Sequence, residues 1–336
     1  MQSILDPAIL FFVFGVLAGT VRSNLEIPPQ ISRFLSLYLL MALGLKGGFA
    51  LAKSGLTAEV AITLGAAMAL AIVIPAVGYQ LLRRYLSGFD AAAIAATYGS
   101  VSAVTFITAI QYLETNQIAY GGHMAAAMAL MESPAIIMAV VFANALRQNP
   151  AASAVVGRSS AALAAAGPAG TGHIPLGKIL HESFTDGAQL LLLGAMVIGM
   201  TTGAAGQDMM APFSVDLFKG MLAFFLLDMG LMAARNIGEL RGKPPALLAY
   251  AVLAPLAHAA LALGLAALLG ISAGNAALLM VLAASASYIA VPAVLRYAIP
   301  EAKPSLYFGM SLGLTFPFNI LLGIPLYVGV AQRVLG

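Results

Sequence analysis

Long apolar runs separated by short polar stretches make up most of the chain. A helix that crosses the hydrocarbon core of a membrane needs about 20 apolar residues, whereas a transmembrane β-strand shows about 10 residues of alternating character. The apolar runs here are unbroken, so they indicate helices. The pattern predicts an all-α polytopic membrane protein with ten spans: residues 8–21, 31–51, 58–82, 90–110, 120–146, 179–203, 213–234, 244–269, 274–296 and 304–332. Pro317 and Pro325 are expected to kink or break the last span.

Composition supports this interpretation over a soluble protein. Hydrophobic residues make up 61% of the 336 residues and charged residues only 9%, whereas a soluble chain is about 25% charged. The exterior must therefore face lipid. The net charge of +3 reflects the loops, and we expect no nucleic-acid partner. Without cysteine, disulfides and thiolate metal sites are excluded. No phosphate loop, zinc pair or nucleophile motif occurs, so we expect neither an enzyme nor an organic cofactor.

The distribution of basic residues predicts the orientation, because cytoplasmic loops carry an excess of Lys and Arg. One set of alternate loops contains only Lys53 and Arg333. The other set contains most of the 16 basic residues: Arg22, Arg33, Arg83, Arg84, Arg147, Arg158, Lys178, Arg235, Arg241, Lys243, Arg296 and Lys303. We therefore expect both termini on the extracytoplasmic side and the loop 147–178 in the cytoplasm.

That cytoplasmic loop divides the chain into two halves of five spans each. Residues 151–172 consist mostly of Ala, Gly and Ser, which is typical of a flexible linker. The predicted units are a first repeat over 1–147, a linker over 148–178 and a second repeat over 179–336. Because five is odd, homologous halves would insert in opposite orientations.

Matches between the halves support homology. Three pairs of identical polar residues are 185 positions apart: Ser100 and Ser285, Ser102 and Ser287, and Tyr112 and Tyr297. Two inverted repeats are typical of secondary transporters. An old duplication in a protein that transports nothing is the alternative.

The fourth and ninth spans carry matching polar interruptions near their middles. Broken backbone inside a membrane is tolerated only around a protein-lined cavity, and Gly99 and Pro292 are candidate break points. In inverted repeats, the second half-helices of both spans would point their N-termini at one place from opposite sides. Such N-termini expose free N–H groups and partial positive charge, which favours a small anion. The alternative is that these serines only pack helices together.

An ionisable residue inside the membrane is a functional candidate, and Glu132 lies about mid-span in the fifth segment. The corresponding part of the tenth span contributes Thr315 and Asn319 near Pro317. Carboxylate, hydroxyl and amide oxygens suit sodium, so these three residues form a predicted sodium site. Glu132 could instead carry a proton or form a structural ion pair.

Two further intramembrane charges, Lys46 and Asp228, lie in repeat-related helices near Gly44 and Gly230. An unpaired buried charge is strongly unfavourable. We therefore predict a structural ion pair between Lys46 and Asp228.

The chain resembles the sodium-dependent bicarbonate transporter family that is best known from cyanobacteria. The resemblance covers nearly the whole chain and rests on several stretches: Gly99 to Thr105, Leu113-Glu114, Pro134-Ala135, Ile237 to Arg241, Ala284 to Ser287, Ile299-Pro300, Lys303 to Ser305 and Gly323 to Leu326. It implies a bacterial inner-membrane protein, a homotrimer with core and gate domains, and uptake of bicarbonate coupled to sodium. It also implies anion contacts from the two broken segments: Gly99, Ser100, Ser102 and Thr105 from one, and Ser285 and Ser287 from the other. Tyr288, directly after these serines, is a further candidate for anion binding.

Two departures from the family pattern bear on function. Cyanobacterial members place an aspartate where this chain has Tyr288, which affects sodium stoichiometry and substrate choice. Their central loop is charged, whereas residues 151–172 are nearly uncharged, which weakens the case for a PII-like regulatory partner. The leading hypothesis is sodium-coupled uptake of a small anion, bicarbonate first. The alternatives are an organic-anion transporter or sodium–proton exchanger, and a membrane scaffold or receptor that transports nothing.

Overall fold

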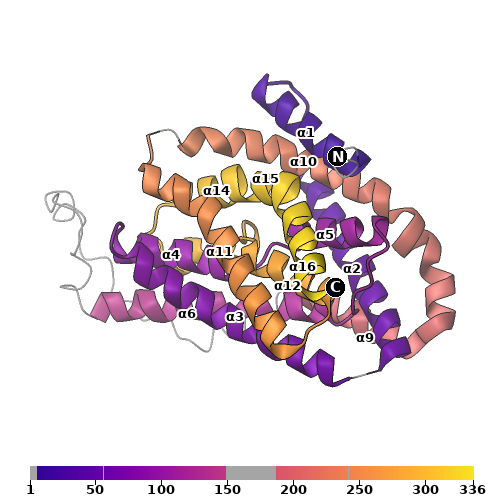
Figure 1. Ribbon diagram of the computed structural model, residues 1–336. Coiled ribbons are helices and arrows are strands. Elements are labelled where there is room, and N and C mark those ends of the chain that lie inside the picture. The colour runs from indigo at the N-terminus through magenta and orange to yellow at the C-terminus, as the bar shows by residue number, and fades with distance from the viewer. Residues whose placement is uncertain (1–5, 56, 149–186, 241) are drawn as a thin grey trace, which may run out of the picture.

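A computed structural model describes residues 6–55, 57–148, 187–240 and 242–336, and in these ranges it contains helices and no strand (Figure 1). The predicted linker 148–178 and the start of the predicted span 179–203 lie almost entirely outside the described residues. The α-helices are α1 (Pro7–Thr20), α2 (Pro29–Ser54), α3 (Ala58–Leu82), α4 (Gly88–Gly99), α5 (Ala103–Thr115), α6 (Met124–Gln148), α9 (Gly187–Ala211), α10 (Phe218–Ile237), α11 (Pro245–Leu269), α12 (Ala273–Ala284), α13 (Ala290–Ala298), α14 (Pro304–Met310), α15 (Phe316–Phe318) and α16 (Ile324–Leu335).

Helix length and composition support a multi-pass membrane protein. Seven helical segments among the described residues are long and apolar enough to cross a membrane. One of them, Gly187–Ile237, contains 51 residues and covers two of the predicted spans, with a kink at Gly203, where φ is 55°. The first predicted span corresponds to the shorter apolar helix α1, and the ninth begins with the short apolar helix α12. The all-helical class is confirmed, whereas the count of ten spans remains a prediction.

Both predicted interruptions are present as breaks in the helices. The fourth span divides into α4 and α5, and Ser100 between them is extended, with φ −98° and ψ 179°. Gly99 ends α4 as predicted, and a side chain there would collide with the ring of Pro75. The ninth span divides into α12 and α13. Its predicted break point, Pro292, is wrong: Pro292 lies in the first turn of α13, where the missing N–H costs no helical hydrogen bond.

The last span is not broken at its prolines. Helical structure continues from Pro304 to Leu335 through two π-helical turns, Ser311–Thr315 and Asn319–Gly323, which flank α15. A π turn carries an extra residue and so accommodates a proline without ending the helix.

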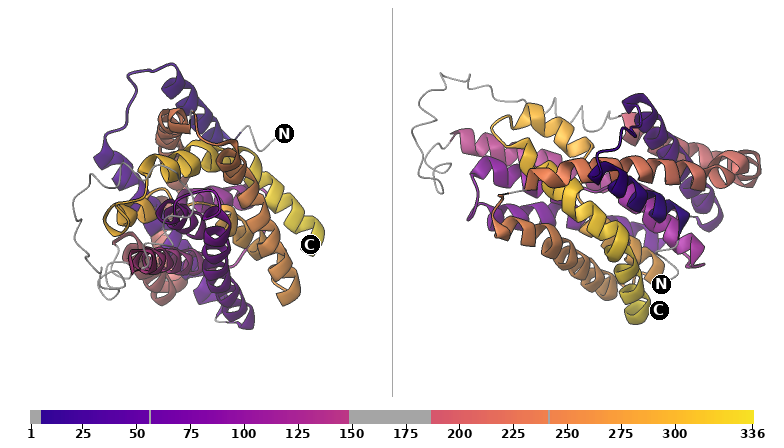
Figure 2. Two further views of the ribbon diagram at one scale, coloured as in Figure 1. Left: turned by 90° about the vertical axis from the view of Figure 1, so that its left-hand side faces the viewer. Right: turned by 90° about the horizontal axis from the view of Figure 1, so that it is seen from above.

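The helices form two groups. In one group α1 packs against α10 and α2 packs against α9, and Figures 1 and 2 show α1 on the outside of the molecule along α10. These pairs touch backbone to backbone at glycines, with Gly230 against Phe12 of α1 and Gly48 against Met196 of α9. The second group contains α3, α4 and α6 together with α11, α12 and α16, and α5 packs on α12.

Candidate functional site

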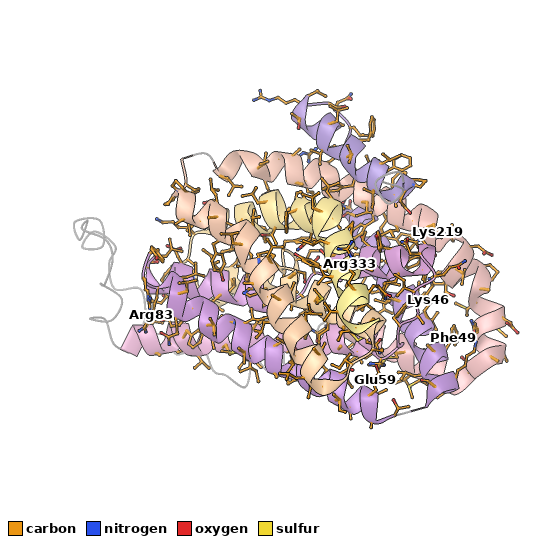
Figure 3. The ribbon with its side chains drawn as sticks, viewed as in Figure 1. Lys46, Phe49, Glu59, Arg83, Lys219 and Arg333 are labelled. Carbon is orange, nitrogen blue, oxygen red and sulfur yellow. The ribbon has the colours of Figure 1, made fainter. Side chains whose placement is uncertain are left out.

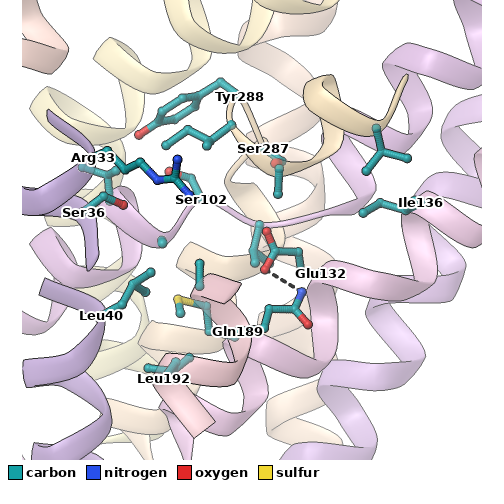
Figure 4. A pocket seen from close by; sticks show the side chains of 18 residues that line it. Arg33, Ser36, Leu40, Ser102, Glu132, Ile136, Gln189, Leu192, Ser287 and Tyr288 are labelled. Carbon is teal, nitrogen blue, oxygen red and sulfur yellow. Dashed lines mark hydrogen bonds between the residues drawn. The ribbon is translucent and has the colours of Figure 1, made fainter. Parts of the chain in front are cut away.

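The two helix groups meet around a cavity of about 430 Å³, here named the central cavity (Figure 4). One wall comes from α2 and α9. The facing wall comes from both helix breaks and from α6. The lining residues are Arg33, Ser36, Leu40, Val101, Ser102, Ala103, Val104, Met128, Glu132, Ile136, Ala188, Gln189, Leu192, Ser287, Tyr288, Ile289, Ala290 and Val294.

The N-terminus of α5 opens into the central cavity. Ser102 is the N-cap residue: its Oγ accepts a hydrogen bond from the N–H of Thr105 at 3.2 Å and from the Thr105 hydroxyl at 3.0 Å. The next two residues, Ala103 and Val104, line the cavity, and no hydrogen bond in the described part of the chain occupies their N–H groups. Free N–H groups at a helix N-terminus attract anions.

The N-terminus of α13 opens into the same cavity but offers fewer donors. The N–H of Val291 donates to Ser287 Oγ at 3.3 Å, and Pro292 has no N–H. Among the first three residues of this helix, only Ala290 keeps a donor for a ligand. The two converging helix ends predicted from the sequence are therefore present but unequal, and α5 is the stronger anion site.

The two breaks are held together by hydrogen bonds across them. The N–H of Ser102 donates to Ser285 Oγ at 2.9 Å, and the N–H of Ser287 donates to the carbonyl oxygen of Thr97 at 2.8 Å. The Ser285 hydroxyl in turn donates to Leu282 O at 2.8 Å. Ser285 therefore fixes the relative position of the broken segments.

The predicted anion-site residues fall into two sets. Ser102, Ser287 and Tyr288 line the central cavity, and the buried hydroxyl of Tyr288 has no hydrogen-bond partner among the described residues. Four others do not line it and lie behind its wall: Gly99, Ser100, Thr105 and Ser285.

Two charged side chains line the central cavity from opposite walls. Glu132 of α6 accepts a hydrogen bond from Gln189 Nε2 of α9 at 2.8 Å, and Figure 4 shows this contact beside Ser287. Arg33 of α2 lies on the Ser102 and Tyr288 side. The cavity thus combines a cationic group and helix N–H donors with a separate carboxylate.

Arg33 is the residue that sequence reasoning missed. The count of basic residues places it on the cytoplasmic side and the predicted span 31–51 includes it, but the pattern does not indicate that it lines a cavity. In the structure it lies near the start of α2, which begins at Pro29. The available signal was the pair Pro28-Pro29, since proline is favoured in the first turn of a helix. Gln189 carried no comparable signal.

The predicted sodium ligands are not gathered in one place. Glu132 lines the central cavity, but Thr315 and Asn319 do not. The Thr315 hydroxyl donates to Ala251 O at 2.6 Å. Asn319 Nδ2 donates to Ala284 O at 2.8 Å, which satisfies a carbonyl group at the end of α12. Sodium binding therefore stays a prediction, and of the three predicted ligands Glu132 is the one that lines the cavity.

The predicted ion pair between Lys46 and Asp228 is wrong. Lys46 Nζ binds the carboxylate of Glu114, at the end of α5, at 3.1 and 3.2 Å. The Tyr120 hydroxyl donates to the same carboxylate at 2.9 Å. The Asp228 side chain instead lies near Ser32, close to the start of α2. Ser32 and Lys46 are about 21 Å apart along that helix at 1.5 Å per residue, so the predicted pair cannot form.

A second ion pair lies at the far end of α6 and α13. Arg147 donates to both carboxylate oxygens of Glu301, at 2.9 and 2.8 Å, and to Ala298 O at 2.9 Å. Burial raises the pKa of the Glu301 carboxyl, but the hydrogen bonds and charge of Arg147 outweigh it and hold this pKa below its ordinary value. The contact anchors the C-terminus of α13, whose N-terminus lines the cavity.

Comparison with known proteins gives a family match over nearly the whole chain. No curated protein matches the chain. A family model described as the Na⁺-dependent bicarbonate transporter superfamily matches residues 7–332, which includes every helix that builds the central cavity. The resemblance noted from the sequence motifs is thereby confirmed, and the chain belongs to the Na⁺-dependent bicarbonate transporter superfamily.

Proposed function

We propose that this protein is a secondary transporter that takes up a small anion, bicarbonate first, together with sodium. The observation that carries the proposal is the composition of the central cavity, whose lining brings together Arg33, the α5 N-terminus and Glu132. Family membership makes transport the expected activity. The coupling ion and the substrate are our inference from the chemistry of the lining.

The anion side of the cavity suits a small planar oxyanion. A guanidinium presents its N–H groups as a planar fork that matches carboxylate-like groups, and the free N–H groups of Ala103 and Val104 add neutral donors. The hydroxyl of Tyr288, buried and without a partner, supplies one further donor. Tyr288 thus provides a neutral group where cyanobacterial relatives place a negative charge.

The cation side is the carboxylate of Glu132. A carboxylate that lines a cavity between membrane helices favours a compensating cation, proton or basic group. The amide of Gln189 donates to it at 2.8 Å and orients the carboxylate in the cavity wall. We infer that sodium binds beside Glu132 and the anion beside Arg33, so that each ion lowers the electrostatic cost of the other.

We also propose that the chain consists of two inverted repeats with both termini extracytoplasmic. Equivalent polar contacts support the repeats. Ser87 precedes α4 and Ser272 precedes α12, 185 positions apart. At the same offset, Asp90 accepts the N–H of Lys303 at 2.8 Å, and Asn275 accepts the N–H of Gly121 at 2.6 Å. Each side chain thereby holds the loop that leads into the last span of the opposite repeat.

A second candidate substrate is a small organic carboxylate. The cavity volume of about 430 Å³ falls in the range of pockets that hold small organic molecules, about 300–1,000 Å³. Bicarbonate would share this space with several waters. A carboxylate of a few carbons would displace these waters and pack its carbon atoms against Leu40 and Met128 of the lining.

Uptake of labelled bicarbonate into proteoliposomes tests the proposal. We expect uptake driven by an inward sodium gradient and abolished when potassium replaces sodium. Inhibition by unlabelled acetate at lower concentration than by bicarbonate would favour the organic carboxylate. Proton movement without anion uptake would indicate a sodium–proton exchanger. No transport of any of these would favour a scaffold or receptor.

A further inference from the structure

A second polar cavity lies at the opposite end of α5 from the central cavity. It has a volume of about 320 Å³ and is enclosed by the start of α1, the last turns of α5 and Leu222 of α10. Its polar lining residues are Asp6, Thr108, Gln111, Tyr112, Thr115 and Asn116. We name it the α1–α5 cavity.

The polar atoms that face this cavity are mainly oxygens. Gln111 is 5% exposed, and its Oε1 has no hydrogen-bond partner, while its Nε2 donates to the Thr115 hydroxyl at 3.1 Å. The Thr108 hydroxyl donates to Val104 O at 2.8 Å, so its lone pairs remain available. A buried amide oxygen without a donor is unfavourable unless a ligand or water meets it.

The charge of the lining is negative. Asp6 contributes a carboxylate, of which Oδ1 accepts the N–H of Ala8 at 2.8 Å as the N-cap of α1. Among the described residues that line the cavity there is no Lys or Arg. The nearest basic residue along α10 is Lys219, one turn before Leu222, and it forms no ion pair within the described ranges. The C-terminal end of α5 adds partial negative charge.

We propose that the α1–α5 cavity binds a hydrated monovalent cation, with sodium as the physiological candidate. Hard cations prefer carboxylate, carbonyl and hydroxyl oxygens, which is the donor set supplied by Asp6, Gln111 and Thr108. The volume leaves room for several waters at about 30 Å³ each, so the ion keeps part of its hydration shell. This site is separate from Glu132.

The position of the cavity gives the site a role. It adjoins the end of α5 that the distribution of basic residues places on the extracytoplasmic side, while the N-terminus of α5 faces the central cavity. A cation held here would be concentrated at the side from which uptake begins. This role rests on the proposed function and orientation, whereas cation binding itself does not.

Thermal stability of the purified full-length protein as a function of sodium concentration tests the site. Choline chloride keeps ionic strength constant, bicarbonate is absent, and Glu132→Gln is the background, so that the central cavity does not contribute through its carboxylate. A ligand that binds only the folded state raises the free energy of unfolding by RT ln(1 + [L]/Kd). We expect a sodium-specific rise in melting temperature in this background.

Two substitutions then remove the proposed ligands one at a time. Gln111→Met keeps the side-chain volume but removes the oxygen, and Asp6→Asn removes the charge but keeps an N-cap residue. Each should raise the sodium concentration for half-maximal stabilisation about tenfold, as expected for one lost contact to an ion. The matched controls Gln80→Met and Asp208→Asn, which change exposed residues outside the cavity, should leave it unchanged.

Absence of a sodium-specific rise in the Glu132→Gln background would overturn the proposal. So would an unchanged sodium response in both Gln111→Met and Asp6→Asn, which would locate the ion elsewhere. Melting temperatures in choline alone reveal whether either variant has lost its fold. Bicarbonate uptake by proteins with native Glu132 is measured separately, so failure of this site and failure of the proposed transport function are distinguishable.

Discussion

Individual residues of the central cavity have separate structural and binding roles, and Arg33 has the clearest binding role. It is the cationic side chain in the lining, and it comes from α2, across the cavity from the helix breaks. An anion bound at the α5 N-terminus would therefore interact with both walls.

Arg33→Gln should weaken anion binding by about 10- to 100-fold, because one contact to a charged group contributes about 1.5–3 kcal/mol. Arg33→Lys should recover only part of this loss, since an ammonium group lacks the planar fork. The control is Arg84→Gln, which removes an exposed arginine outside the cavity. Bicarbonate dependence of uptake measures the effect, and equal values for the Arg33 and Arg84 variants would contradict the assignment.

Ser102 combines a structural role with a position in the cavity wall, and a matched serine separates the two. Ser87 caps α4 as Ser102 caps α5, but Ser87 does not line the cavity. Replacing either with alanine should destabilise the protein by about 0.5–2 kcal/mol through loss of the cap. Only Ser102→Ala should also weaken anion binding. Similar transport by both variants at equal stability would limit Ser102 to a capping role.

Pairs of helices are held together at glycines, as α10 illustrates. A side chain at Gly230 would meet backbone atoms of Phe12, Gly15 and Val16 in α1, whereas Gly220 of the same helix has open space around it. Small residues let membrane helices approach closely, and backbone atoms cannot move aside as a flexible side chain can.

Gly230→Ala should therefore lower the melting temperature by separating α1 from α10, with a destabilisation of about 1–3 kcal/mol from overpacking. Gly220→Ala should leave stability unchanged or raise it by up to about 1 kcal/mol, since alanine favours helix more than glycine does. Thermal unfolding in detergent compares the two. Equal effects would mean that the close approach of α1 and α10 contributes nothing measurable.

At the scale of the whole molecule, the central cavity lies between two helix groups, and an ion pair joins these groups beyond it. Lys46 belongs to α2 and Glu114 to α5, and their side chains are only 16% and 32% exposed. Lys46 also lies 4.2 Å from the ring centroid of Phe218 of α10. A transport cycle that separates α2 from α5 near Lys46 (Figure 3) would break this contact.

Reversing the charge at one position, by Lys46→Glu or Glu114→Lys, should lower stability by between about 1 kcal/mol, typical of an exposed pair, and about 3–5 kcal/mol, typical of a buried one. The double exchange should restore most of the loss. The double substitution Lys46→Met with Glu114→Gln should keep the fold. It should destabilise the conformation that contains the ion pair relative to other conformations of the transport cycle. Melting temperatures and uptake rates of the four proteins check this, and failure of the double exchange to restore stability would contradict a direct pairing.

The sequence predicted the helical class, both helix breaks and four lining residues, because apolar length and polar interruption are local properties. It could not predict which helix faces meet. The predicted partner of Lys46 is wrong because residues at corresponding positions of two repeat-related helices need not contact each other. Arg33 lies inside the predicted span 31–51, but its position in the cavity depends on how α2 packs against distant helices. Thr315 and Asn319 were grouped with Glu132 by chemistry alone, whereas packing directs them to carbonyl groups elsewhere.

The hydrogen bonds from Ser102 to Ser285 and from Ser287 to Thr97 also constrain how a substrate can be released. One joins backbone to side chain and the other backbone to backbone, and together they tie the two broken segments to each other. In the proposed transport cycle, a bound ion would therefore move together with both broken segments. Between the conformations that open to the two sides of the membrane, only the wall built by α2 and α9 would then change. The contact between Arg33 and the ion would change with it. Unequal affinities on the two sides would therefore arise from a single helix pair.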